Sequence, residues 1–148
     1  MNEKDGILKM WYCQSENHLM YTESDNNGIT WKPLIRCNMD RGNWNGWHVD
    51  IIKTDIGFEG LICARIPKLN QYTLYYARSV DGINWKTSAN PLISPKPNSW
   101  DSNFIYRSTL LKVNDKYQIW YSACNKEYVW HIAHTQFSRE EIDKLHMM

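Results

Sequence analysis

The sequence predicts an all-β protein built from four-stranded β-propeller blades, with a short helix at its C-terminus. Two observations predict this fold: a strand pattern that repeats about every 56 residues, and hairpin-type turns between the strands. Four short strands in a unit of about 45–55 residues are typical of a propeller blade. A β-sandwich also has evenly spaced strands, but it does not require matching Trp and Tyr positions from unit to unit.

The repeat is clearest in one strand type, which occurs at residues 19–24, 74–79 and 129–135. Two pairs of aromatic residues have the same spacing: Trp44 with Trp100, and Tyr72 with Tyr128. Apolar strands at residues 47–53 and 104–112 open the second and third units and are predicted to be the innermost strands of their blades. The chain is thus interpreted as one partial propeller domain, 1–148, with blades at about 5–43, 44–99 and 100–137. The first unit begins in its second strand.

The turns and the C-terminus support this division. The pairs Asn27-Gly28 and Asp81-Gly82 lie between strands, and such pairs supply the positive φ that tight hairpins require. No segment before residue 138 has the apolar spacing of a helix. Ser138, followed three residues later by Glu141, forms a capping-box pattern, which predicts a short helix over 138–146.

Composition excludes several classes of function. The net charge is +1 with mixed signs, so no basic patch predicts nucleic-acid binding, and no apolar run reaches the roughly 20 residues of a membrane span. The N-terminus is polar and is not a signal peptide. The four cysteines have no zinc spacing and are interpreted as free thiols, which suit a reducing compartment, so we expect a cytoplasmic protein. No cofactor or metal ion is expected.

Residues 79–85 (SVDGINW) and 90–93 (NPLI) resemble the S-x-D-G-x-x-W … N-P-[LVI] signature of five-bladed propellers of the glycoside-hydrolase type. That group includes arabinanase and β-xylosidase relatives, invertase and levansucrase relatives, and mannoside phosphorylase relatives. Residues 117–122 (YQIWYS) resemble its Y-x-M-W-Y-S strand, and residues 46–50 and 106–108 are similar to its inner-strand motifs. The resemblance covers nearly all of residues 5–137. It implies the C-terminal part of such a propeller, about two and a half to three blades of five.

A second resemblance leads to a different propeller. Residues 24–31 (SDNNGITW) are similar to the sialidase Asp box, S-x-D-x-G-x-T-W, with Asn26 in place of the Asp. In six-bladed propellers that box is a structural hairpin and does no chemistry. Sialidases also require three arginines around the substrate carboxylate and a Tyr/Glu nucleophile pair, and this chain has few arginines outside its turns. The sialidase-like propeller is therefore the second hypothesis.

Glycoside hydrolysis requires two carboxyl groups that flank the scissile bond. In the propellers that the chain resembles, these groups lie on the innermost strands, which makes Asp50 and Asp101 the candidate catalytic residues. A carboxylate in a buried strand is costly unless it is paired or functional, so Asp50 could instead form a structural ion pair with an arginine. Asp101 could equally be a turn or cap residue, and Glu59 is expected at the surface or between blades.

The candidate substrate-binding residues are Trp47, His48, Tyr106 and Arg107. An arginine offers a rigid fork of donors to a carboxylate or to sugar hydroxyls, although it could instead bridge two blades. Because inner strands of neighbouring blades run in the same direction, we expect Asp50 to share one cleft with these residues. The predicted function is a glycoside-hydrolase-like propeller that acts on or binds a carbohydrate. The alternative is a non-catalytic binding or interaction fragment. Self-association, or upstream blades, would complete the ring.

Overall fold

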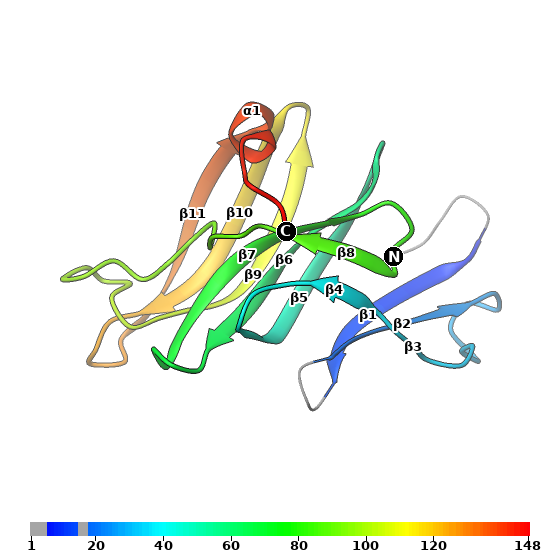
Figure 1. The fold of residues 1–148 in the computed structure, drawn as a ribbon, viewed down its shortest axis with the longest axis horizontal. Helices are drawn as coiled ribbons and strands as arrows, with labels where there is room; N and C mark the ends of the chain where they lie inside the picture. Colours follow the sequence, from blue (N-terminus) through cyan, green and yellow to red (C-terminus); the bar gives the residue numbers. More distant parts are fainter. Residues whose placement is uncertain (1–5, 15–17) are drawn as a thin grey trace.

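The structure is a computed structural model in which residues 6–14 and 18–148 are described. Three β-sheets lie side by side, and one short helix lies near the C-terminus (Figure 1). The first sheet contains β1 (Leu8–Gln14), β2 (His18–Ser24) and β3 (Ile35–Arg36). The middle sheet contains β4 (Asn38–Asp40), β5 (Asn45–Thr54), β6 (Gly57–Ile66), β7 (Gln71–Ser79) and β8 (Asn84–Thr87). The third contains β9 (Phe104–Val113), β10 (Lys116–Cys124) and β11 (Trp130–Ser138).

The middle sheet is the most complete blade. Its strands β5, β6, β7 and β8 follow one another as antiparallel neighbours, as the repeat predicts. The predicted inner strands at 47–53 and 104–112 correspond to β5 and β9, which confirms them. In the first sheet, β1 is an edge strand and matches the second strand of the other blades. β4 lies within the predicted unit 5–43, but it pairs in parallel with β8 and extends the middle sheet.

Two hydrophobic clusters hold neighbouring sheets together. Between the middle and third sheets, Leu61 and Tyr76 pack with Ile105 and Ile119, all of them buried. Between the first and middle sheets, Leu19 and Tyr21 pack with buried residues of β6 and with Trp85. Alternate residues of each strand face these clusters, as a period of two requires. Each large side chain buried in this way contributes about 1.5–3 kcal/mol, so packing between sheets is the main stabilising term.

The predicted turn pairs lie in turns, but these are longer than tight hairpins: β2 ends at Ser24 and β3 begins at Ile35, and β7 ends at Ser79 and β8 begins at Asn84. Positive φ is found at three of the four predicted positions, and Asp81 is the exception. Asn27 (φ 57°), Gly28 (φ 84°) and Gly82 (φ 79°) all adopt positive φ. The Gly82 carbonyl accepts hydrogen bonds from the indole N–H groups of Trp85 (2.9 Å) and Trp11 (2.7 Å), so this turn also ties the first sheet to the middle one. A Cβ atom at Gly82 would lie 2.7 Å from the Trp11 ring, which explains why glycine is needed there.

The helix is shorter than the predicted range 138–146. α1 spans Arg139–Asp143, and the capping box of Ser138 and Glu141 is confirmed. The helix ends early because the C-terminal residues pair with the middle sheet: the Ala89 N–H donates to the His146 carbonyl, and the Met148 N–H donates to the Thr87 carbonyl. Within the described residues no helix is long and apolar enough to cross a membrane. All four cysteines are free thiols, and Cys13 is the one that is not fully buried.

Candidate functional site

The inner strands β5 and β9 place their functional residues at equivalent positions. The β5–β6 hairpin closes at the pair Thr54–Gly57, and the β9–β10 hairpin closes at Val113–Lys116, so residues 59 positions apart correspond. Trp47 therefore corresponds to Tyr106, and His48 corresponds to Arg107. The four predicted substrate-binding residues thus lie at the same height along the inner strands of two neighbouring blades.

Both inner strands carry a β-bulge at this level. In β5 the register against β6 shifts between Gly46 and His48, which leaves Trp47 as the extra residue. In the β9–β10 ladder the register shifts between Tyr121 and Ala123, opposite Tyr106 and Arg107. A bulge bends a strand and redirects side chains, and bulges are frequent next to active sites. The bulges explain how Trp47 and Tyr106 come to point toward each other across the two strands.

The Tyr106 hydroxyl lies at the centre of the contacts between these strands. It accepts a hydrogen bond from the Trp47 indole N–H at 3.1 Å and lies 2.9 Å from Nε2 of His48. The Arg107 guanidinium lies 6.0 Å from the centre of the Tyr106 ring. The structure therefore brings together Trp47, His48, Tyr106 and Arg107, which the sequence had separated by about 60 residues.

Further aromatic rings extend this contact into a continuous surface, which we call the aromatic shelf. Tyr72, at the start of β7, packs edge-on against Trp47 and Tyr106, and Trp130, at the start of β11, packs on Tyr106. The shelf consists of Trp47, Tyr72, Phe104, Tyr106, Tyr128 and Trp130. Trp47 (46%), Tyr128 (63%) and Trp130 (47%) remain largely exposed. The sequence did not assign Tyr72, Phe104, Tyr128 and Trp130 to the site, although the repeat of Tyr72 and Tyr128 was a usable signal.

His48 supplies a neutral polar group beside the shelf. Burial, and secondarily the positive charge of Arg107, lower the pKa of His48 below its ordinary value of 6.5. The imidazole is therefore neutral at pH 7. A neutral imidazole has one donor and one acceptor nitrogen, so the ring can bind Tyr106 with Nε2 and leave its other nitrogen for a ligand hydroxyl.

Asp50 lies two residues from His48 on β5 and is held by β9. Its Oδ2 accepts hydrogen bonds from the Leu110 N–H at 2.7 Å and from the Thr109 hydroxyl at 3.0 Å. These partners are neutral, so the ion pair with arginine that the sequence suggested is not among the contacts of Asp50. The side chain is half-buried and borders a cavity of about 300 Å³ between β1 and β5. Thr109, which binds Asp50, lies two residues from the predicted binding residue Arg107 on β9, or about 7 Å along the strand.

Asp101 lies in the turn before β9. It is buried, and its Oδ1 has no hydrogen-bond partner among the described residues. Burial, and secondarily the charge of Asp101, raise the pKa of Tyr121, which indicates that the two side chains lie close together. The catalytic roles of Asp50 and Asp101 stay predictions. In the part of the chain that the structure describes, no group of three or more His, Cys, Asp or Glu side chains could hold a metal ion.

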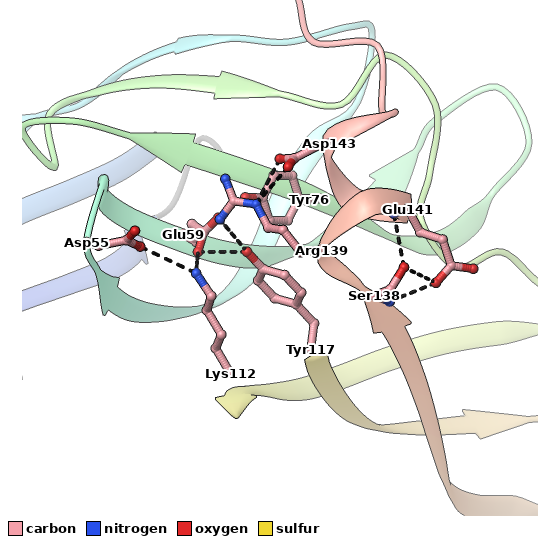
Figure 2. A network of polar contacts seen from close by, with 9 residues as sticks. All are labelled: Asp55, Glu59, Tyr76, Lys112, Tyr117, Ser138, Arg139, Glu141 and Asp143. Atoms are coloured by element: carbon pink, nitrogen blue, oxygen red, sulfur yellow. Dashed lines mark hydrogen bonds and ion pairs between the residues drawn. The ribbon is translucent and has the colours of Figure 1, made fainter. Parts of the chain in front are cut away.

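A second polar cluster lies between the middle and third sheets and is centred on the buried Glu59 (Figure 2). The Glu59 carboxylate is completely buried and accepts hydrogen bonds from the hydroxyls of Tyr76 (2.5 Å) and Tyr117 (2.9 Å). Arg139 of α1 (3.5 Å) and Lys112 of β9 (3.7 Å) neutralise its charge. Glu59 is therefore a blade-interface residue. Its neighbours already occupy the carboxylate, so this cluster joins two blades and the C-terminal helix.

Comparison with known proteins agrees with the fold. The sequence matches no family model, and no curated protein matches it significantly. The structure is similar to that of a mutant GH32 β-fructofuranosidase from Bombyx mori in complex with sucrose, with a TM-score of 0.73 and 14% sequence identity. The match covers 95% of this chain and 32% of that chain, so the protein spans about a third of the length of its structural neighbour. At this identity the likeness shows the fold alone: the chain consists of β-propeller blades.

Proposed function

We propose that this protein binds a carbohydrate on the aromatic shelf. The observation that carries the proposal is the meeting of Trp47 and Tyr106 at equivalent bulged positions of two inner strands, with His48 beside them. Flat, partly exposed indole and phenol rings offer an apolar face to a sugar ring, and their polar edges suit its hydroxyls. The fold adds support, because the structural neighbour was solved with sucrose.

Replacing Trp47 with Ala is expected to weaken binding of an oligosaccharide at least about tenfold, because central aromatic anchors carry most of the energy of a binding site. Stability should change little, since the side chain is 46% exposed. Isothermal titration with a panel of neutral and acidic oligosaccharides measures the effect. The matched control is Trp31→Ala, a 40% exposed indole that is not part of the shelf. Equal losses in both variants, or no loss in Trp47→Ala, would contradict the proposal.

Hydrolysis is the second candidate function. It is favoured by Asp101, whose buried carboxyl oxygen lacks a hydrogen-bond partner among the described residues. A buried carboxyl group without partners is costly, and such groups concentrate where they serve chemistry. Asp50 is the other carboxylate that the sequence predicts, but it borders the cavity between β1 and β5, whose lining does not include Asp101.

Asp50→Asn separates a catalytic role of Asp50 from a structural one. The amide oxygen can still accept the Leu110 N–H, so we expect the melting temperature to stay nearly unchanged. Loss of a general base lowers the rate of hydrolysis by about 10²–10⁴-fold, measured on aryl glycosides. Asp50→Ala removes the acceptor and should destabilise the fold by about 1–3 kcal/mol. An Asp50→Asn protein with an unchanged hydrolysis rate would exclude Asp50 from catalysis.

We also propose that a second copy of the chain covers the open faces of the first and third sheets. The support is the position of β1 at the edge of the first sheet, among the described strands, and the exposed apolar residues on the outer face of the third sheet. The predicted cytoplasmic location stays a proposal and rests on the free thiols.

A further inference from the structure

The charge at the aromatic shelf is unbalanced. Arg107 is exposed, and it forms no ion pair within the described part of the chain. The nearest carboxylate along the two strands, that of Asp50, accepts hydrogen bonds from Thr109 and Leu110 instead. The positive charge of Arg107 reaches into the site, because it helps to lower the pKa of His48.

The position of Arg107 fits a ligand that carries both a ring and an anion. Its guanidinium lies 6.0 Å from the centre of the Tyr106 ring, so it stands at the border of the shelf. The equivalent residue of the neighbouring blade is His48, which is neutral at pH 7 and adds hydrogen bonds without a second charge. A sugar ring stacked on Trp47 and Tyr106 would therefore meet the Arg107 guanidinium at its edge.

We propose that the shelf binds an acidic sugar, with the ring on Trp47 and Tyr106 and the carboxylate of a uronate residue paired with Arg107. This inference rests on the proposed carbohydrate binding and names its ligand class. The planar guanidinium presents paired N–H donors that match a carboxylate, and a charge-assisted pair of hydrogen bonds is about twice as strong as a neutral one. A neutral sugar leaves the guanidinium in water and gains none of this energy.

The test uses two ligands with the same sugar backbone, one charged and one neutral: α-1,4-linked trigalacturonate and its fully methyl-esterified form. Isothermal titration at low ionic strength should show the acid binding at least about tenfold more tightly than the ester, because an ionised acceptor strengthens the hydrogen bonds. The preference should disappear in Arg107→Gln. It should persist in Arg78→Gln, which removes an equal charge at an exposed position of β7, outside the shelf. Thermal melts establish that both variants fold.

The outcomes separate this inference from the proposed function. Equal affinity for the acid and the ester would overturn the acidic-sugar inference and leave carbohydrate binding in place. A preference for the acid that survives in Arg107→Gln would also overturn it, because another cation would then hold the carboxylate. Failure of every neutral and acidic oligosaccharide to bind would overturn carbohydrate binding itself.

Discussion

Replacing Glu59 with Gln is expected to lower the free energy of unfolding by about 2–3 kcal/mol. Removing one partner of a buried ion pair typically costs about 3–5 kcal/mol, and the value is reduced here because the remaining cations reach solvent. The side chains of Lys112 and Arg139 are 19% and 27% exposed, whereas that of Glu59 is completely buried. The new amide would also present donors to Tyr76 and Tyr117, which themselves donate to the carboxylate.

The matched control for this substitution is Glu140→Gln. Glu140 pairs with Lys144 at 2.7 Å on the exposed face of α1, and both side chains are at least 70% exposed. Such a surface pair contributes about 0.3–0.5 kcal/mol, so urea unfolding should resolve the two variants. If Glu59→Gln costs no more than Glu140→Gln, the internal cluster does not hold the blades together. Glu59→Asp, which keeps the charge but shortens the side chain, should recover part of the loss.

Self-association is the second large effect that we expect. The outer face of the third sheet carries Leu111 (50% exposed), Trp120 (38%) and Ile132 (82%), which the strand register places on one side. Among the described strands, β1 forms the edge of the first sheet, beside the cavity between β1 and β5. Exposed apolar faces and strand edges pair with other chains unless they are covered, so a second copy can bury both features. Sedimentation velocity should show the mean mass rising with protein concentration.

Ile132→Lys tests which face is responsible for association. The side chain is 82% exposed, so the substitution should leave the folded monomer intact while it disrupts the apolar face. Val80→Lys is the control, because Val80 is equally exposed (84%) in the turn after β7 and lies away from that face. The expected result is a shift toward monomer in Ile132→Lys alone. A wild-type chain that is monodisperse, monomeric and melts cooperatively would contradict this expectation.

Much of the fold could be predicted because its signals are local. The apolar segments at 47–53 and 104–112 identified β5 and β9 to within about two residues, and the Asn27-Gly28 and Asp81-Gly82 pairs marked real turns, with positive φ at Asn27, Gly28 and Gly82. The helix was predicted too long because its end depends on a distant contact. The capping box defines where the helix begins, whereas its end follows from pairing of the last residues with Thr87 and Ala89.

The site could be predicted in part for the same reason. Trp47, His48, Tyr106 and Arg107 were expected to converge because inner strands of neighbouring blades run alongside each other, and three of them are in direct hydrogen-bond contact. The partners of Asp50, and the partner Tyr117 of Glu59, were not predictable, because they come from another sheet and depend on how the blades pack. Trp130 was not predicted for a similar reason: its place on the shelf depends on its ring reaching Tyr106 of β9 from β11, on the other side of β10.

The most direct test of carbohydrate binding on the shelf is a spectrum of the indole N–H groups. The protein has eight tryptophans, and a ¹⁵N–¹H spectrum with single Trp→Phe variants for assignment resolves each of them. On titration with an oligosaccharide, the signals of Trp47 and Trp130 should shift together and saturate with one dissociation constant. Those of Trp44 and Trp85, which are 4% and 2% exposed in the core, should stay in place. Shifts that appear at Trp31 but not at Trp47 would place the ligand elsewhere and contradict the proposal.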